Sequence, residues 1–189
     1  MSSATIPTAA PALMSAEQFM KLHGDDSGIE LVKGRIVRLP MPGLNHGYVC
    51  LEAAAILRDF VKPRDLGRLM TNDSFVHAGS NPESVRGADV CYFSYARLPK
   101  DEPCPTGAAE VSPNLVVEVR SPSDRSREVQ EKVDEYLEAG VDVVLVLDPS
   151  LESATVFRKT SEDRLSSRDA LTLPDVLPGF SVLVRKFFE

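Results

Sequence analysis

The stretch from Pro113 to Leu147 constrains the fold most, because it holds two apolar runs that flank a helical pattern. Residues 115–119 and 141–147 are short, apolar and rich in valine, whereas residues 126–139 follow helical spacing and end before Gly140. A strand, a helix and a strand with short connections form a βαβ unit, whose strands are parallel and buried on both faces. The sequence therefore predicts an α/β fold.

A single carboxylate interrupts the first of these strands. Glu118 lies in the run 115–119, and strand alternation places it on the same face as Val116 and Arg120. A buried charge costs free energy unless it is paired or binds a cation. Glu118 is therefore either the partner of an arginine such as Arg120 or a ligand of a cation.

A second carboxylate, Asp89, stands at the start of the apolar run 88–93. Two isolated carboxylates at the mouths of adjacent core strands suit Mg²⁺, which keeps several waters and completes its shell with substrate phosphate. Asp89 can instead cap its strand through local backbone hydrogen bonds. A shared metal site accounts for both carboxylates at once.

Lys132 is the candidate cation near this site. On a helical wheel with Val129 at zero, Lys132 lies at about −60° and Tyr136 at about −20°, so Lys132 flanks the buried stripe. A right-handed crossover packs the helix over the sheet, which brings Lys132 toward Glu118. An ammonium there can orient an attacking water or balance charge on a phosphate. The alternative is a surface pair with Glu128, four residues earlier.

The N-terminal part predicts a helix, a hairpin and a second helix. Ser15 and Gln18 have the spacing of a capping box, which predicts a helix over residues 16–23. Residues 29–32 and 36–39 flank Gly34 as the strands of a hairpin. Helical spacing then predicts a helix over residues 45–61, with Asn45 as its N-cap.

Shorter elements are expected in the remainder of the chain. The predicted strands cover residues 68–70, 74–76, 88–93 and 154–158. Residues 98–113 hold several prolines and are predicted to form a long loop. The apolar segment after residue 177 does not indicate a single state.

Length and composition limit the class of protein. The 189 residues suit one domain, expected over residues 14–189 after a disordered lead-in over residues 1–13. The net charge of −7 opposes non-specific attraction to nucleic acid and membranes. Three cysteines without C-x-x-C spacing argue against a disulfide framework and a structural zinc site, and they predict a reducing, cytoplasmic location. No apolar run reaches the roughly 20 residues of a membrane span.

Several motifs in order resemble the Uma-two family of putative restriction endonucleases, within the PD-(D/E)XK nuclease superfamily. The resemblance runs from about Ser15 to the segment Leu177–Phe180. Its motifs are Glu30-Leu31-Val32-Lys33-Gly34, His46 opening a helix, Ala88-Asp89-Val90, Pro113-Asn114-Leu115-Val116-Val117-Glu118-Val119, Ser121-Pro122-Ser123-Asp124, Lys132, Tyr136 and Gly140-Val141. Ala88 replaces the proline of the signature, and Arg120 stands where its lysine would be.

The resemblance implies a restriction-endonuclease-like mixed sheet flanked by helices, with an N-terminal helix and hairpin. It implies phosphodiester hydrolysis of nucleic acid, expected to be DNA, with Mg²⁺ or Mn²⁺ held by Asp89 and Glu118. Lys132 fills the place of the missing lysine, because the guanidinium of Arg120 does not readily release a proton. Arg120 is expected to clamp the scissile phosphate. By analogy, double-strand cutting predicts a homodimer.

Three further residues resemble supporting members of the family's site. They are Glu30 as an additional carboxylate, His46 at a helix start, and Tyr136. Glu30 can also belong to the polar face of a hairpin, and His46 can be an ordinary helix-start residue.

Two other functions remain open from the sequence. Arg120 in the signature position and the acidic net charge favour a non-catalytic module that binds nucleic acid or protein. Only the acidic charge favours a small-molecule hydrolase. The basic residues that can contact phosphates lie in two groups, which are otherwise solvated hairpin and turn charges. These groups are Lys33, Arg35 and Arg38, and Lys62, Arg64 and Arg68.

Overall fold

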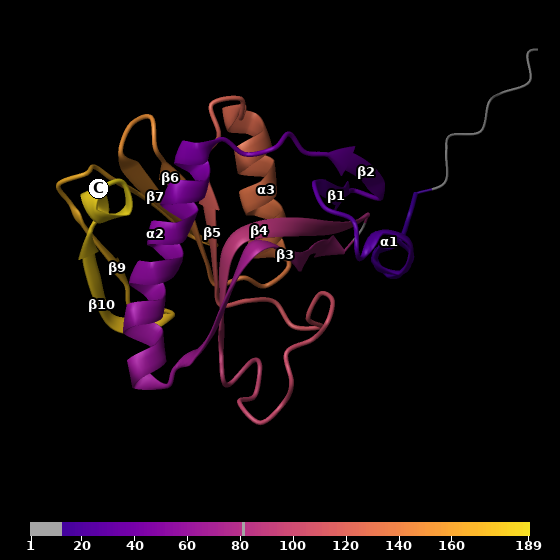
Figure 1. Cartoon of the computed structure of the whole chain (residues 1–189), viewed down its shortest axis with the longest axis horizontal. Coiled ribbons are helices and arrows are strands. Elements are labelled where there is room, and N and C mark those ends of the chain that lie inside the picture. Colours follow the sequence, from indigo (N-terminus) through magenta and orange to yellow (C-terminus); the bar gives the residue numbers. More distant parts are fainter. Residues whose placement is uncertain (1–12, 81) are drawn as a thin grey trace, which may run out of the picture.

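The computed structural model describes residues 13–80 and 82–189 (Figure 1). In these residues three α-helices, two 3-10 helices and ten strands are formed. The disorder predicted for residues 1–13 falls outside the described part of the chain except at Leu13. That expectation and the expectation of a single domain remain predictions.

Eight of the strands form one mixed sheet, in the order β2-β1-β4-β5-β6-β7-β8, with β3 paired to β4 outside this path. Its strands are β1 (Ile29–Val32), β2 (Arg35–Arg38), β3 (Gly67–Ser80), β4 (Glu83–Ser94), β5 (Leu115–Val119), β6 (Val143–Asp148), β7 (Ser153–Arg158) and β8 (Ser161–Leu165). β5 and β6 are parallel and the other pairs are antiparallel. The predicted α/β class with a mixed sheet is confirmed.

Helices cover both faces of this sheet (Figure 1). The helix α2 (Leu44–Val61) packs on one face together with the separate pair β9 (Ala170–Leu173) and β10 (Leu177–Leu183). The helix α3 (Ser126–Glu138) packs on the other face. No helix within the described residues is long and apolar enough to cross a bilayer.

The βαβ unit forms as predicted. β5 and β6 pair in parallel from Leu115 opposite Val143 to Val119 opposite Leu147, and α3 connects them. The odd-numbered residues of β5 face the α2 side of the core, whereas Val116 faces the α3 side. Glu118 therefore points toward α3, as strand alternation predicted.

The N-terminal elements agree with the sequence except at one cap. The capping box of Ser15 and Gln18 starts α1 (Ala16–His23), and β1 and β2 form the predicted hairpin. The predicted N-cap Asn45 is wrong, because α2 begins one residue earlier at Leu44 and Gly43 occupies the cap. Gly43 has no side chain to offer, so the first turn of α2 lacks a side-chain cap.

The two short strands predicted at residues 68–70 and 74–76 are parts of one long strand, β3. The residues between them have the polar composition of a turn, but Asn72 and Asp73 form a bulge inside the ladder with β4. β4 in turn begins at Glu83 rather than Ala88, and its first half contains the buried Arg86. The charge of Arg86 interrupts the apolar pattern, so the sequence did not indicate a strand before Ala88.

The C-terminal part also contains elements that the sequence did not reveal. β8 has a fully polar pattern from Ser161 to Arg164, as expected for an edge strand, and β9 is short. The segment of undecided state forms β10 and the 3-10 helix η2 (Val184–Phe187). Phe180 and Phe187 then join the core below α2.

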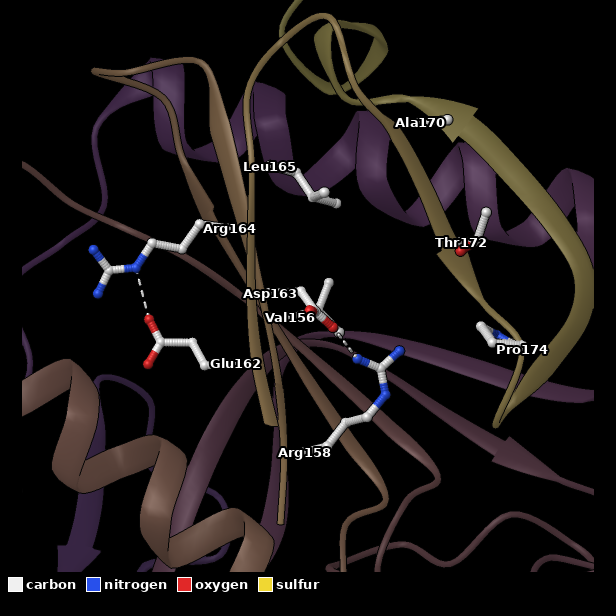
Figure 2. A pocket seen from close by; sticks show the side chains of 9 residues that line it. All are labelled: Val156, Arg158, Glu162, Asp163, Arg164, Leu165, Ala170, Thr172 and Pro174. Carbon is white, nitrogen blue, oxygen red and sulfur yellow. Dashed lines mark hydrogen bonds and ion pairs between the residues drawn. The ribbon is translucent and has the colours of Figure 1, made fainter. Parts of the chain in front are cut away.

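A hollow of about 360 Å³ opens at the far edge of the sheet, between β8 and the β9–β10 pair (Figure 2). The charged side chains that line it form ion pairs with neighbouring residues. Arg158 contacts Asp163 at 2.8 Å and Asp175 at 2.6 Å, and Arg164 contacts Glu162 at 2.7 Å. This hollow therefore presents no unpaired charge to a ligand.

The partners of β4 change along its edge opposite β3. On this edge Val85 pairs with Leu31 of β1, and Val90 pairs with Val117 of β5. Residues 86–89, which lie between these pairs, have no recorded strand partner on this edge in the described part of the chain. We call this interruption in strand pairing, at residues 86–89, the β4 gap. The strands β1 and β5 lie on either side of it along the same edge of β4.

The packing predicts a strong effect of truncation in β6. Leu145 is fully buried between β5 and β7, so Leu145→Ala should lower the free energy of unfolding by about 2–5 kcal/mol. Leu151 is 72% exposed, so Leu151→Ala should change it by less than about 0.5 kcal/mol. Urea unfolding measures both. Equal effects would contradict this placement of the core.

Candidate active site

Side chains take the place of strand partners at the β4 gap. The backbone N–H of Gly87 donates to Glu30 Oε1 at 2.9 Å, and the carbonyl oxygen of Gly87 accepts from Lys132 Nζ at 3.0 Å. The N–H of Val119 donates to Asp89 Oδ2 at 2.7 Å. The site residues thus hold the backbone of the sheet as well as one another.

Glu118 is bound from the α3 side. Lys132 Nζ donates to its Oε2 at 2.8 Å, and the Tyr136 hydroxyl donates to its Oε1 at 2.9 Å. The predicted approach of Lys132 to Glu118 is confirmed, and the surface pair with Glu128 is wrong. The pairing of Glu118 with Arg120 is also wrong.

Lys132 makes two hydrogen bonds and a second ion pair. Besides Glu118 and the Gly87 carbonyl, Nζ lies 3.2 Å from Glu30 Oε1. Burial lowers the pKa of the ammonium, but the charges of Glu118 and Glu30 outweigh it and raise the pKa above its usual value. Lys132 is therefore charged and held in one position.

Glu30 belongs to a buried network rather than to the solvated face of a hairpin. Arg86 donates from Nη1 to Glu30 Oε2 and from Nε to Glu135 Oε2, both at 2.9 Å. Burial opposes the charge of Glu30, but Lys132 and Arg86 lower its pKa overall. Glu30 thus positions Lys132 and Gly87.

The sequence reasoning missed Arg86 and Glu135 in this network. Glu135 had a usable signal, since it lies three residues after Lys132 and is therefore its neighbour on the surface of α3. Arg86 had none, because it stood outside the predicted strand. A buried arginine became apparent only with the full length of β4.

Asp89 is approached from α2. His46 Nε2 lies 3.4 Å from Asp89 Oδ2, and His46 Nδ1 lies 3.4 Å from Cys50 Sγ. The hydrogen bond to Asp89 raises the pKa of His46, whereas burial and then the charge of Asp89 raise the pKa of the Cys50 thiol. Cys50 was not expected here, although it follows His46 by one helical turn.

Arg120 lies apart from these groups. Its Nη1 donates to Asp148 Oδ2 at 2.9 Å, and its Nη2 donates to the Asp124 carbonyl at 3.3 Å. Its side chain is 29% exposed, so part of it remains accessible at the end of β5, although Nε is buried without a hydrogen-bond partner in the described residues.

Asp73 is a further carboxylate that the sequence did not single out. The bulge in β3 places Asn72 and Asp73 opposite Asp89, since Thr71 pairs with Val90 and Ser74 with Ala88. Partial burial and the charge of Asp89 raise the pKa of Asp73, and Lys132 acts in the opposite direction. The signal that was available is the pair of residues, Asn and Asp, that most readily adopt a positive φ.

Carboxylates outnumber cations around the β4 gap. The buried carboxylates Glu30, Asp89 and Glu135 and the largely buried Glu118 face two largely buried cations, Arg86 and Lys132. Burial, only partly offset by Lys132, raises the pKa of Glu118, and the charge of Asp89 adds to this shift. A proton on Glu118 or an added cation would reduce the imbalance.

The donors present fit a divalent ion. Asp89 uses only Oδ2 in its recorded bonds, which leaves Oδ1 available, and carboxylate oxygens are the ligands that Mg²⁺ and Mn²⁺ prefer. Among the described residues, the three ligand atoms that converge within 4.8 Å belong to His46, Cys50 and Asp89. Glu118 lies outside that group, and its two oxygens accept hydrogen bonds from Lys132 and Tyr136.

Comparison with known proteins gives the family. The model of the family Uma2, described as "Putative restriction endonuclease", matches residues 16–185. No curated protein matches the chain.

A solved structure gives the fold. It is the crystal structure of a putative nuclease belonging to DUF820 from Anabaena variabilis, with 19% sequence identity and a TM-score of 0.79. The likeness covers 93% of this chain and 97% of that chain. The restriction-endonuclease-like fold implied by the sequence motifs is thus confirmed, and the chain belongs to the Uma2 family.

Proposed function

We propose that this chain is a nuclease that uses Mg²⁺ or Mn²⁺ to hydrolyse phosphodiester bonds of nucleic acid, with DNA as the expected substrate. The observation that carries the proposal is the excess of carboxylates at the β4 gap. With all four carboxylates ionised, two negative charges remain after Arg86 and Lys132 are counted, and the raised pKa of Glu118 reflects the cost of that ionisation. A divalent ion compensates this excess and is itself the usual means of binding a phosphate.

Asp89 and Glu118 would hold the ion, and Tyr136 would keep Glu118 oriented through its bond to Oε1. When bound, the ion supplies charge stabilisation to the phosphate and its leaving oxygen. His46, placed beside Asp89, would fix the orientation of that carboxylate. These roles use the contacts present in the chain.

Lys132 would act on the attacking water or on a phosphate oxygen. The contacts of Lys132 Nζ with Glu30 and with the Gly87 carbonyl would keep the ammonium in place. The N–H group that donates to Glu118 in the free chain would then donate to the substrate. A fixed ammonium costs no reorganisation during the reaction. Glu30 is a positioning residue in this scheme.

Basic side chains beside the site would contact the phosphate backbone. Lys33 lies between β1 and β2 and approaches Glu135 Oε1 at 3.8 Å, and Arg35 and Arg38 are exposed on the same hairpin. The accessible part of Arg120 would clamp the scissile phosphate. A local basic patch can bind nucleic acid although the whole chain carries a charge of −7.

Cleavage assays with Mg²⁺ or Mn²⁺ on several DNA and RNA forms test the proposal. Asp89→Asn and Glu118→Ala should each lower the rate by about two to three orders of magnitude, as removal of one electrostatic contributor typically does. Glu162→Ala, an exposed change on β8, should leave the rate unchanged. Equal rates in the wild type and both site variants would refute the mechanism.

Ionisation of Glu118 predicts a pH effect on the metal-free chain. Burial raises its folded-state pKa from about 4.5 to about 8, so a stabilising contribution present at low pH is lost as the pH rises through this window. Glu118→Gln removes the ionisable group, so this variant should become more stable relative to wild type between pH 5 and 8. Urea unfolding measures the difference. A difference that does not change with pH would contradict the raised pKa.

The alternative function is a non-catalytic module that binds nucleic acid or protein on the same fold. Its support is that Lys132 already neutralises Glu118, so the site is in part satisfied without an ion. Calorimetric titration with Mn²⁺ separates the two. Binding that Asp89→Asn abolishes supports the nuclease, and no binding supports the module.

Double-strand cutting would require two sites, so we also propose a homodimer on nucleic acid. Analytical ultracentrifugation with a DNA duplex measures the stoichiometry. Two chains per duplex are expected, and one chain per duplex would exclude this arrangement.

A further inference from the structure

We propose that Asp73 is a third carboxylate ligand of the divalent ion, delivered to Asp89 by the bulge of β3. The inference rests on the proposed metal-dependent function and adds a residue to it. Asp73 has no counterpart among the site residues expected from the sequence. Its placement follows from the hairpin of β3 and β4.

The bulge places Asp73 next to the β4 gap. Asn72 and Asp73 both have left-handed backbone conformations, with φ of 69° and 53°. These two residues together oppose the single residue Asp89 on β4, because the register shifts between Thr71 and Ser74. A regular ladder would place only one residue opposite Asp89, so the bulge adds one side chain at this position.

A glycine on β4 makes room for this side chain. A Cβ added to Gly87 would lie 3.0 Å from Asp73 Cβ and 3.3 Å from the Asp73 carbonyl oxygen. Asp73 therefore packs directly over Gly87. The backbone of the same glycine is bound by Glu30 and Lys132, so Asp73 stands against the centre of the β4 gap.

The carboxylate of Asp73 is free to bind an ion. Across residues 13–80 and 82–189 no hydrogen bond or ion pair to it is recorded, and the residue is exposed beside a cavity of about 240 Å³ under the loop that follows β4. The charged groups that influence it are Asp89, Lys132, His46 and Glu30. Asp73 is not among the ligand atoms that converge within 4.8 Å in the described residues, so its carboxylate would have to turn toward Asp89 Oδ1 when an ion binds.

The simpler alternative is that Asp73 serves only the backbone of the bulge. Asn fits a positive φ as well as Asp does, so Asp73→Asn keeps the backbone role and removes the ligand charge. Asp65 provides a matched control. It is also an exposed aspartate with positive φ, at 54°, but its partner is Lys100 at 2.7 Å.

The test is calorimetric titration of the purified chain with Mn²⁺. Asp73→Asn should weaken binding about 10–100-fold, the scale seen for groups that support a metal site, whereas Asp65→Asn should bind as wild type does. Thermal unfolding without metal confirms that both variants fold. Unchanged affinity in Asp73→Asn overturns the inference.

Gly87→Ala separates a ligand from a distant charge. The added Cβ displaces the Asp73 side chain without removing its charge, so affinity should fall in this variant as well. Combined with Asp73→Asn, it should cause little further loss, because both changes act through one contact. A loss in Asp73→Asn with full affinity in Gly87→Ala would reduce Asp73 to a long-range charge and overturn its role as a ligand. If Gly87→Ala does not fold, Asp73→Glu replaces it. The longer side chain moves the carboxylate, so this variant should also bind Mn²⁺ more weakly than the wild type. Wild-type affinity in Asp73→Glu would overturn the role of Asp73 as a ligand.

The wild type distinguishes failure of this inference from failure of the proposed function. Mn²⁺ binding that depends on Asp89 but not on Asp73 refutes only the third ligand. Absence of Mn²⁺ binding refutes both.

Discussion

A strand in the interior of a sheet must satisfy its backbone groups even where no neighbouring strand is present. β4 meets this requirement at Gly87 and β5 at Val119, with Glu30, Lys132 and Asp89 as partners. Because these bonds hold the sheet, the carboxylates and the ammonium are as rigid as the strands. Preorganisation of the charges and integrity of the fold therefore depend on the same hydrogen bonds.

The sequence predicted the parts of the site that lie within one repeating pattern. Alternation along β5 placed Glu118 toward α3, and the helical period placed Lys132 and Tyr136 over it. Both deductions need only a strand, a helix and the handedness of their connection. Asp89 was expected on an adjacent strand only because it begins an apolar run, and the pairing of β4 with β5 bears out that adjacency, although the metal role of these residues remains a proposal.

The parts that the sequence did not predict depend on contacts between distant segments. Arg86 is buried because it pairs with Glu30 from β1 and with Glu135 from α3. The sequence around Arg86 does not reveal these two partners. Asp73 was hidden because a bulge has the composition of a turn. Likewise, β8 is polar throughout and forms only because β7 offers it an edge. Tertiary pairing decided each of these cases.

The two halves of the site are each assembled from nearby chain. Asp73 and Asp89 belong to the two strands of one hairpin, and Glu118 and Lys132 are only 14 residues apart in one strand–helix unit. Short separations make loop closure inexpensive in entropy and favour early formation during folding. The Asp73–Asp89 half and the Glu118–Lys132 half therefore each depend on local chain closure, and the pairing of β4 with β5 brings them together.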